Sequence, residues 1–145
     1  MRALLLSLLA ASQLASGAAT VYGQINRQEV EWALSIACAV LDDTYDCPSR
    51  VPVALAAEMD GYWGLYYSGT DIVWINEKLV GPHWDTFAKQ VLIHELAHYI
   101  VDVNEPGTSK CDSEAAARRA GNAYAASNNR GDLTDYHWQE RYKCE

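Results

Sequence analysis

The chain has 145 residues, half of them hydrophobic and 21% charged, which is enough apolar material for one folded domain and excludes global disorder. Eleven Lys and Arg against 19 Asp and Glu give a formal net charge of −8, so no basic face is expected for a nucleic acid or an anionic membrane. No run of 18 apolar residues follows the N-terminal region, which argues against a transmembrane helix.

Residues 1–19 have the layout of a secretory signal peptide. Met1-Arg2 supplies a short positive start, an apolar run follows, and small residues end the segment at Ala18-Ala19. We therefore expect an exported protein, secreted or periplasmic, that is not inserted in the membrane once the signal is removed and is a monomer. The remaining 20–145 then form a single domain.

The first half of that domain carries one helical pattern and then three short β patterns. Asn26 followed by Glu29 resembles a capping box, and apolar residues at helical spacing predict a helix over Arg27–Leu41. Aromatic and β-branched residues between Gly-containing turns predict a three-stranded antiparallel meander. Its strands are expected at Val51–Ala57, Tyr62–Tyr67 and Ile72–Asn76.

The second half is helical. Helical spacing predicts a helix over Asp85–Val101, and a second helix that starts at Asp112 or Ser113 and runs to about Ala126. A short last helix is expected over Thr134–Tyr142. With no internal repeat and no linker, the predicted fold class is α+β, with the meander between the N-terminal helix and the later helices.

The four cysteines are even in number and contain no CxxC pair, so a structural zinc knuckle is poorly supported. In an exported chain two disulfides are the default, and three pairings are possible. We favour Cys38–Cys47, which ties the end of a helix to the following loop, and Cys111–Cys144, which fixes the C-terminus.

One pentapeptide carries the chemistry: His94-Glu95-Leu96-Ala97-His98 matches the pattern HExxH. Residues four apart share a helix face, so His94 and His98 can point a ring nitrogen at one metal ion. Glu95 lies about 100° further round the helix, where it can reach a water on that ion without ligating it. The alternative is two ordinary histidines on a solvated helix face.

This motif resembles the zincin-type zinc metallopeptidases, and the chain is most similar to small gluzincins such as the ImmA/IrrE-type minimal peptidases. The resemblance covers about residues 61–126 through the strand Asp71–Asn76, the motif His94–His98 and the segment Glu114–Ala117. It implies a β-meander, an active-site helix and a following helix that supplies Glu114 as the third metal ligand. It also implies that the strand before the active-site helix lies along the cleft and pairs with an extended substrate.

Other zincin branches fit less well. Two alternatives remain open: another third ligand, or a structural role for Glu114. Metzincins need Gly and His or Asp where Val101 and Asn104 stand, and aspzincins need Asp where Lys110 stands. Asp112 is a second candidate ligand, although we expect it to cap the helix that carries Glu114. Glu114 itself could instead stabilise the helix dipole.

Two imidazoles and one carboxylate with an open fourth position are the usual ligand set of catalytic Zn²⁺, and a facial Fe(II) site is the less favoured alternative. Zinc lowers the pKa of its bound water, and Glu95 acts as general base. We take His137 as the first candidate for the donor that stabilises the oxyanion. Further candidate donors are Tyr136, Tyr99, Tyr66 and Tyr67. Asp102 and Asn104 are possible partners of the metal ligands, and His83 is expected to be structural.

The sequence therefore predicts a secreted, zinc-dependent metalloendopeptidase that hydrolyses a peptide or protein substrate. The alternative is a catalytically silent zinc- or peptide-binding module, such as an inhibitor or an effector. The intact Glu95 argues against that alternative, because binding alone does not need a base.

Overall fold

A computed structural model of the chain describes residues 20–21, 25–80, 84–130 and 138–144. The predicted signal peptide lies outside these residues, as do His83, Tyr136 and His137. The helices are α2 (Arg27–Leu41), α3 (Thr86–Asn104), α4 (Lys110–Ser127), α5 (Trp138–Tyr142) and the 3₁₀ turn η1 (Glu77–Leu79). The strands are β1 (Thr20–Val21), β2 (Pro52–Ala56), β3 (Gly64–Tyr66) and β4 (Val73–Asn76).

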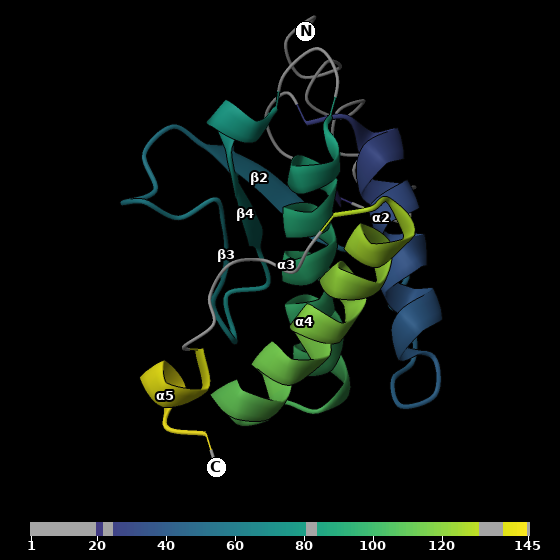
Figure 1. The fold of residues 1–145 in the computed structure, drawn as a ribbon, viewed down its shortest axis with the longest axis vertical. Coiled ribbons are helices and arrows are strands. Elements are labelled where there is room, and N and C mark those ends of the chain that lie inside the picture. Colours follow the sequence, from purple (N-terminus) through teal and green to yellow (C-terminus); the bar gives the residue numbers. More distant parts are fainter. Residues whose placement is uncertain (1–19, 22–24, 81–83, 131–137, 145) are drawn as a thin grey trace, which may run out of the picture.

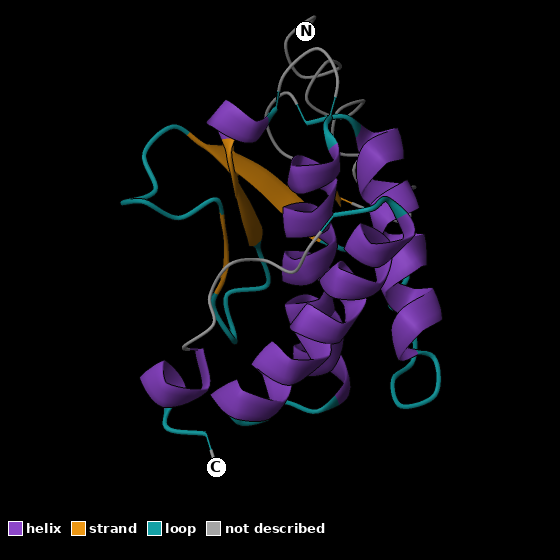
Figure 2. Ribbon diagram, viewed as in Figure 1, coloured by secondary structure: helices purple, strands orange, loops and turns teal. Residues whose placement is uncertain are grey.

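Helix α3 lies at the centre of the molecule, between the sheet and the helices α2 and α4 (Figure 1). Figure 2 shows the same arrangement, with the strands β2, β3 and β4 on one side and the long helices α2, α3 and α4 on the other. Nearly every side chain of α3 between Ala88 and Val101 is buried, including His94 and Glu95. A helix that is apolar almost all round has to be covered on all sides, and this places the HExxH motif inside the fold.

The sheet is mixed, so the predicted antiparallel meander is wrong. Its order is β1-β2-β4-β3, and β4 pairs in parallel with β2 and antiparallel with β3. β4 is an inner strand, and its residues Val73 and Ile75 are fully buried, whereas the residues of β3 are all half-buried, as is usual for an edge strand. The 16 residues from 57 to 72 provide the long crossover that a parallel pair requires.

N-cap residues explain where helices α2 and α4 begin. Asn26 caps α2 by accepting from the backbone N–H groups of Gln28 and Glu29, which confirms the predicted start of that helix. Helix α4 begins earlier than predicted, because its N-cap is Ser109, whose side chain accepts from the N–H of Asp112. The stronger sequence signals at 112 and 113 therefore lie in the first turn of α4.

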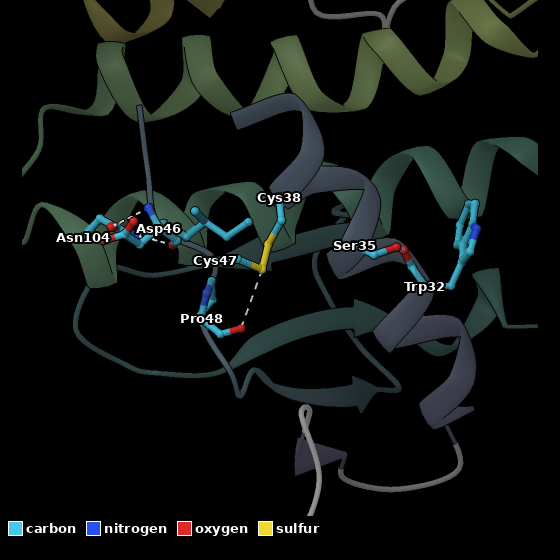
Figure 3. The surroundings of a disulfide bond; sticks show 8 residues. Trp32, Ser35, Cys38, Asp46, Cys47, Pro48 and Asn104 are labelled. Atoms are coloured by element: carbon cyan, nitrogen blue, oxygen red, sulfur yellow. Dashed lines mark hydrogen bonds between the residues drawn. A yellow bond between two sulfur atoms is a disulfide. The ribbon is translucent and has the colours of Figure 1, made fainter. Parts of the chain in front are cut away.

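Both predicted disulfides are present, Cys38–Cys47 and Cys111–Cys144, and two disulfides fit an exported protein. The first joins the end of α2 to the next loop, and beside it Asn104 accepts from the N–H of Asp46 and donates to its carbonyl (Figure 3). None of the helices in the described part of the chain combines the length and the apolar character needed to cross a bilayer.

Candidate metal centre

Three side chains from α3 and α4 direct ligand atoms at one point. The Nε2 atoms of His94 and His98 are 3.2 Å apart, as expected for residues four apart on one helix. Glu114 of α4 completes the group, with its Oε1 3.4 Å from Nε2 of His94 and its Oε2 3.1 Å from Nε2 of His98. All three residues are buried or nearly so.

The spacing fits a small tetrahedral metal ion. Ligand atoms about 2.1 Å from Zn²⁺ at tetrahedral angles lie about 3.4 Å from one another. The three distances between the ligand atoms, 3.1, 3.2 and 3.4 Å, are close to that value. His94, His98 and Glu114 therefore form a donor set for a divalent ion, and they are the only such set among the residues that the structure describes.

A small residue allows α4 to lie against α3. Gly121 is buried, and a Cβ atom there would lie 3.3 Å from the carbonyl oxygen of Gln90 and 3.4 Å from Cβ of His94. A larger side chain would push the two helices apart and move Glu114 away from the histidines.

The surroundings of Glu114 favour its charged form. Arg118, one turn further along α4, donates from Nε to Oε1 of Glu114 at 3.0 Å. Burial acts against the carboxylate, but hydrogen bonds from His94 and His98 outweigh it and lower the pKa of Glu114. The carboxylate is therefore ionised and ready to ligate.

His98 is oriented by a residue next to Glu114. Its Nδ1 lies 2.7 Å from Oγ of Ser113, which leaves Nε2 facing the other ligands. Burial favours the neutral ring, but the hydrogen bond to Glu114 and the negative charges of Glu95 and Glu114 outweigh burial and raise the pKa of His98. A metal ion bound at Nε2 of His98 would take the place of the proton that the charged ring carries there. The buried Nδ1 of His94 has no hydrogen-bond partner within the described residues.

Glu95 lies beside the three ligands, packed against the edge strand β3. Its carboxylate accepts a hydrogen bond from the backbone N–H of Tyr66, and burial raises its pKa although both histidines oppose the shift. The contact is so close that a Cβ atom at Gly64 would lie 2.6 Å from Cγ of Glu95. Only glycine fits at this position of β3.

A cavity of about 390 Å³ opens over these groups. One wall is β3 with its flanking residues, another is α3, and the start of α4 and part of α5 complete the lining. The polar and aromatic residues around the ligands are Tyr62, Tyr66, Tyr67, Ser68, Asp102, Thr108, Lys110, Ser113, Arg141 and Tyr142.

Asp102 holds the β3–β4 turn on α3. It lies one turn after His98, and its carboxylate accepts hydrogen bonds from the hydroxyls of Tyr66 and Ser68 and, at 3.1 Å, from the N–H of Gly69. These hydrogen bonds outweigh burial and lower the pKa of Asp102. Asp102 lines the cavity, but its hydrogen-bond partners are in the turn, so it is not the partner of a metal ligand that the sequence analysis considered. Asn104 instead binds the loop after α2.

Three other residues that the sequence analysis names as candidate ligands or donors are not placed in the site. Asp112 is exposed and accepts from the hydroxyl of Ser109, so it takes no part in the ligand group. Tyr99 is buried, packs edge-on against Tyr66 and is not among the described residues that line the cavity, so it is not a candidate donor. The first candidate donor, His137, lies outside the described residues.

Tyr142 is a residue of this cavity that the sequence analysis missed. Its ring is half-buried, and the charge of Glu114 acts on its hydroxyl, whose pKa is raised mainly by burial. A signal for it existed in the sequence, because the predicted Cys111–Cys144 disulfide brings the neighbouring Tyr142 to the start of α4.

The strand expected to lie along the cleft is also a different one. Both edges of β4 are occupied, by β2 and β3, so β4 cannot pair with a substrate. The strand beside Glu95 is β3.

Comparison of the chain with protein-family models, with curated proteins and with solved structures gives no match in any of the three.

Proposed function

We propose that the chain is a zinc-dependent metallopeptidase of the zincin type. One observation carries the proposal: a buried carboxylate, Glu95, lies next to the His94, His98 and Glu114 ligand group at the wall of a cavity. The nitrogen and oxygen donors and their spacing suit Zn²⁺ with an open fourth position. A site that only stores or binds zinc has no need of a carboxylate beside the ligands.

Each residue then has a distinct task. Zinc bound by these three residues would lower the pKa of a bound water to about 7 and polarise a carbonyl oxygen. Glu95 accepts the proton of the attacking water, and the N–H of Tyr66 holds its carboxylate in place. Ser113 fixes the ring of His98, and Arg118 fixes Glu114.

The edge of β3 offers a place for an extended peptide. The carbonyl of Trp63 accepts from the N–H of Asn76, so alternate residues of the strand pair with β4. Gly64 and Tyr66 therefore turn their backbone groups away from β4, toward the cavity that both residues line. Because the N–H of Tyr66 is bound to Glu95, the groups left for a peptide are the N–H and carbonyl of Gly64 and the carbonyl of Tyr66. A substrate strand added there would bring a peptide bond to Glu95.

The oxyanion needs a further donor, and we assign it to Tyr142 or to His137. Tyr142 lines the cavity and lies near Glu114, and a phenol can donate to a developing negative charge. His137 immediately precedes α5 in the sequence, so it stays a candidate from the sequence analysis.

Two amide variants test the proposal. Glu95→Gln should retain zinc and fold while peptide hydrolysis falls by at least about 10²–10⁴-fold, because the base is lost. Glu114→Gln should lose zinc, since a neutral amide is a poorer ligand than a carboxylate. Zinc is measured by elemental analysis of protein purified without chelators, and cleavage by mass spectrometry of a diverse peptide library.

Wild-type protein that carries zinc but cleaves no peptide would contradict the peptidase and favour the silent binding module. Wild-type protein without zinc would contradict the metal centre itself. If Glu114→Gln binds zinc normally, the third ligand is another residue.

A further inference from the structure

Two cationic side chains line the cavity next to the candidate metal centre. Lys110 is the first residue of α4, and Arg141 lies in α5. Nζ of Lys110 and Cζ of Arg141 each lie 6.0 Å from the centre of the Tyr142 ring. The fold thus gathers two positive charges, from distant parts of the sequence, on one wall of the cavity.

Covalent and aromatic contacts fix that wall. The Cys111–Cys144 disulfide joins the residue after Lys110 to the end of the chain just beyond α5. On the other side of α5, the guanidinium carbon of Arg118 lies 5.3 Å from the centre of the Trp138 ring. The two cations are therefore held near the metal ligands and not on a detached tail.

The charge balance of the cavity favours an anionic ligand. Of its three carboxylates, Glu114 is bound by the two histidines and Arg118, Asp102 by the β3–β4 turn, and Glu95 by the N–H of Tyr66. A divalent ion would balance two of these three charges, and Lys110 and Arg141, which also donates a hydrogen bond to the hydroxyl of Tyr142, bring two positive charges to the same lining. Within the described residues Lys110 has no ion pair. This positive region lies in a chain of net charge −8.

We infer that this cavity recognises peptides with an Asp or Glu side chain close to the bond to be cleaved, and that Lys110 and Arg141 bind that carboxylate. The inference rests on the proposed function and adds a substrate class to it. Two cations beside a cleft favour anionic partners through both direct contact and steering, and salt weakens both effects. The acidic remainder of the molecule would otherwise repel such a peptide.

Three pools of fluorescein-labelled decapeptides test this inference. All pools contain the same mixture of neutral residues, and each pool has Glu, Gln or Lys at its central position. Zinc-loaded wild-type protein should cleave the Glu pool about three- to tenfold faster than the Gln pool at low salt, the size expected for two exposed ion pairs. The ratio should fall toward one at about 0.5 M NaCl. Binding of each pool to the zinc-loaded Glu95→Gln variant is measured in parallel by fluorescence polarisation.

The variant Lys110→Gln/Arg141→Gln should bring the Glu-to-Gln ratio to about one. Its matched control, Arg27→Gln/Lys89→Gln, removes the same charges from α2 and the first half of α3, outside the cavity lining, and should keep the ratio. A wild-type ratio of one, or a preference that survives in Lys110→Gln/Arg141→Gln, overturns the inference. If no pool is cleaved, the proposed function fails, and binding of the pools to the zinc-loaded Glu95→Gln variant then tests the inference alone. Equal binding of the Glu and Gln pools, or no binding, overturns the inference. Tighter binding of the Glu pool upholds it.

Discussion

At the scale of single residues, Gly64 is the position where the strand and the proposed base come closest. A Cβ atom there would lie 2.6 Å from Cγ of Glu95 and 2.8 Å from Cγ1 of Val91, closer than real side chains approach. Neither neighbour is the free end of a flexible side chain, because Glu95 is buried and Val91 is in the core. The site therefore depends on a residue that has no side chain.

We predict that Gly64→Ala retains zinc but loses at least about tenfold in kcat/KM, because displacing Glu95 or β3 by a fraction of an ångström disturbs the reacting geometry. Zinc content and cleavage of a peptide that the wild type hydrolyses are the measurements.

The control is Gly61→Ala, where a Cβ atom would meet nothing within 4 Å but φ is +85°. It should cost about 1–2 kcal/mol of stability and leave cleavage nearly unchanged. Equal activity losses in the two variants would contradict the specific contact with Glu95.

At the scale of elements, the hydrogen bonds of Asp102 join α3 to the β3–β4 turn and so keep β3 on Glu95. Because these bonds lower the pKa of Asp102 below its ordinary 3.8, the ionised carboxylate stabilises the fold above about pH 4. This contribution disappears as the pH falls through the lowered pKa, where the carboxylate takes up a proton.

We therefore predict that wild type is more stable than Asp102→Asn by about 1–3 kcal/mol at neutral pH, and that the difference shrinks below pH 4. Urea unfolding at a series of pH values measures it. Tyr66→Phe, which removes one of the donors, should show a smaller difference with the same pH dependence. A difference that is constant down to strongly acidic pH would show that the charge of Asp102 is not involved.

The elements differ in how well the sequence predicts them. Helix α2 was predicted with its true ends, because its cap at Asn26 and its apolar spacing are local signals. The strand positions were right to within a few residues, but their pairing was wrong. Val53 pairs with Val73, twenty residues away, and no local pattern distinguishes that pairing from a meander.

The same contrast holds within the site. His94 and His98 follow from the spacing of one helix, and Glu114 followed only from a resemblance to a known arrangement. The contact of Gly64 with Glu95 and the place of Tyr142 depend on how separate elements pack, which no single segment records.

At the scale of the whole molecule, the two disulfides have different roles. Cys38–Cys47 closes a short stretch at the end of α2, whereas Cys111–Cys144 attaches α5, with Arg141 and Tyr142, to the start of α4. The metal ligands themselves lie on α3 and α4.

We predict that Cys111→Ser/Cys144→Ser keeps zinc but loses the preference for acidic peptides, since α5 is no longer fixed at the cavity. The free energy of unfolding of this variant should fall by about 3–4 kcal/mol, against about 2–3 kcal/mol for Cys38→Ser/Cys47→Ser, because the Cys111–Cys144 disulfide closes the longer loop. The Cys38→Ser/Cys47→Ser variant should keep the preference. Thermal unfolding, zinc content and the Glu-to-Gln cleavage ratio are the measurements, and an unchanged ratio in Cys111→Ser/Cys144→Ser would contradict the role of α5.

The order of the sheet has a consequence for how firmly each strand is held. β3 has three residues and one neighbouring strand, and the chain reaches it and leaves it through turns with φ of +85° at Gly61 and +80° at Gly69. Detaching β3 would leave the β1-β2-β4 ladder intact. The backbone amides of β3 can thus exchange their hydrogens with solvent through a local opening, whereas those of Val73 and Ile75 exchange only when the core unfolds. The wall that holds Glu95 is accordingly an edge strand that can open locally while the inner strands of the sheet stay paired.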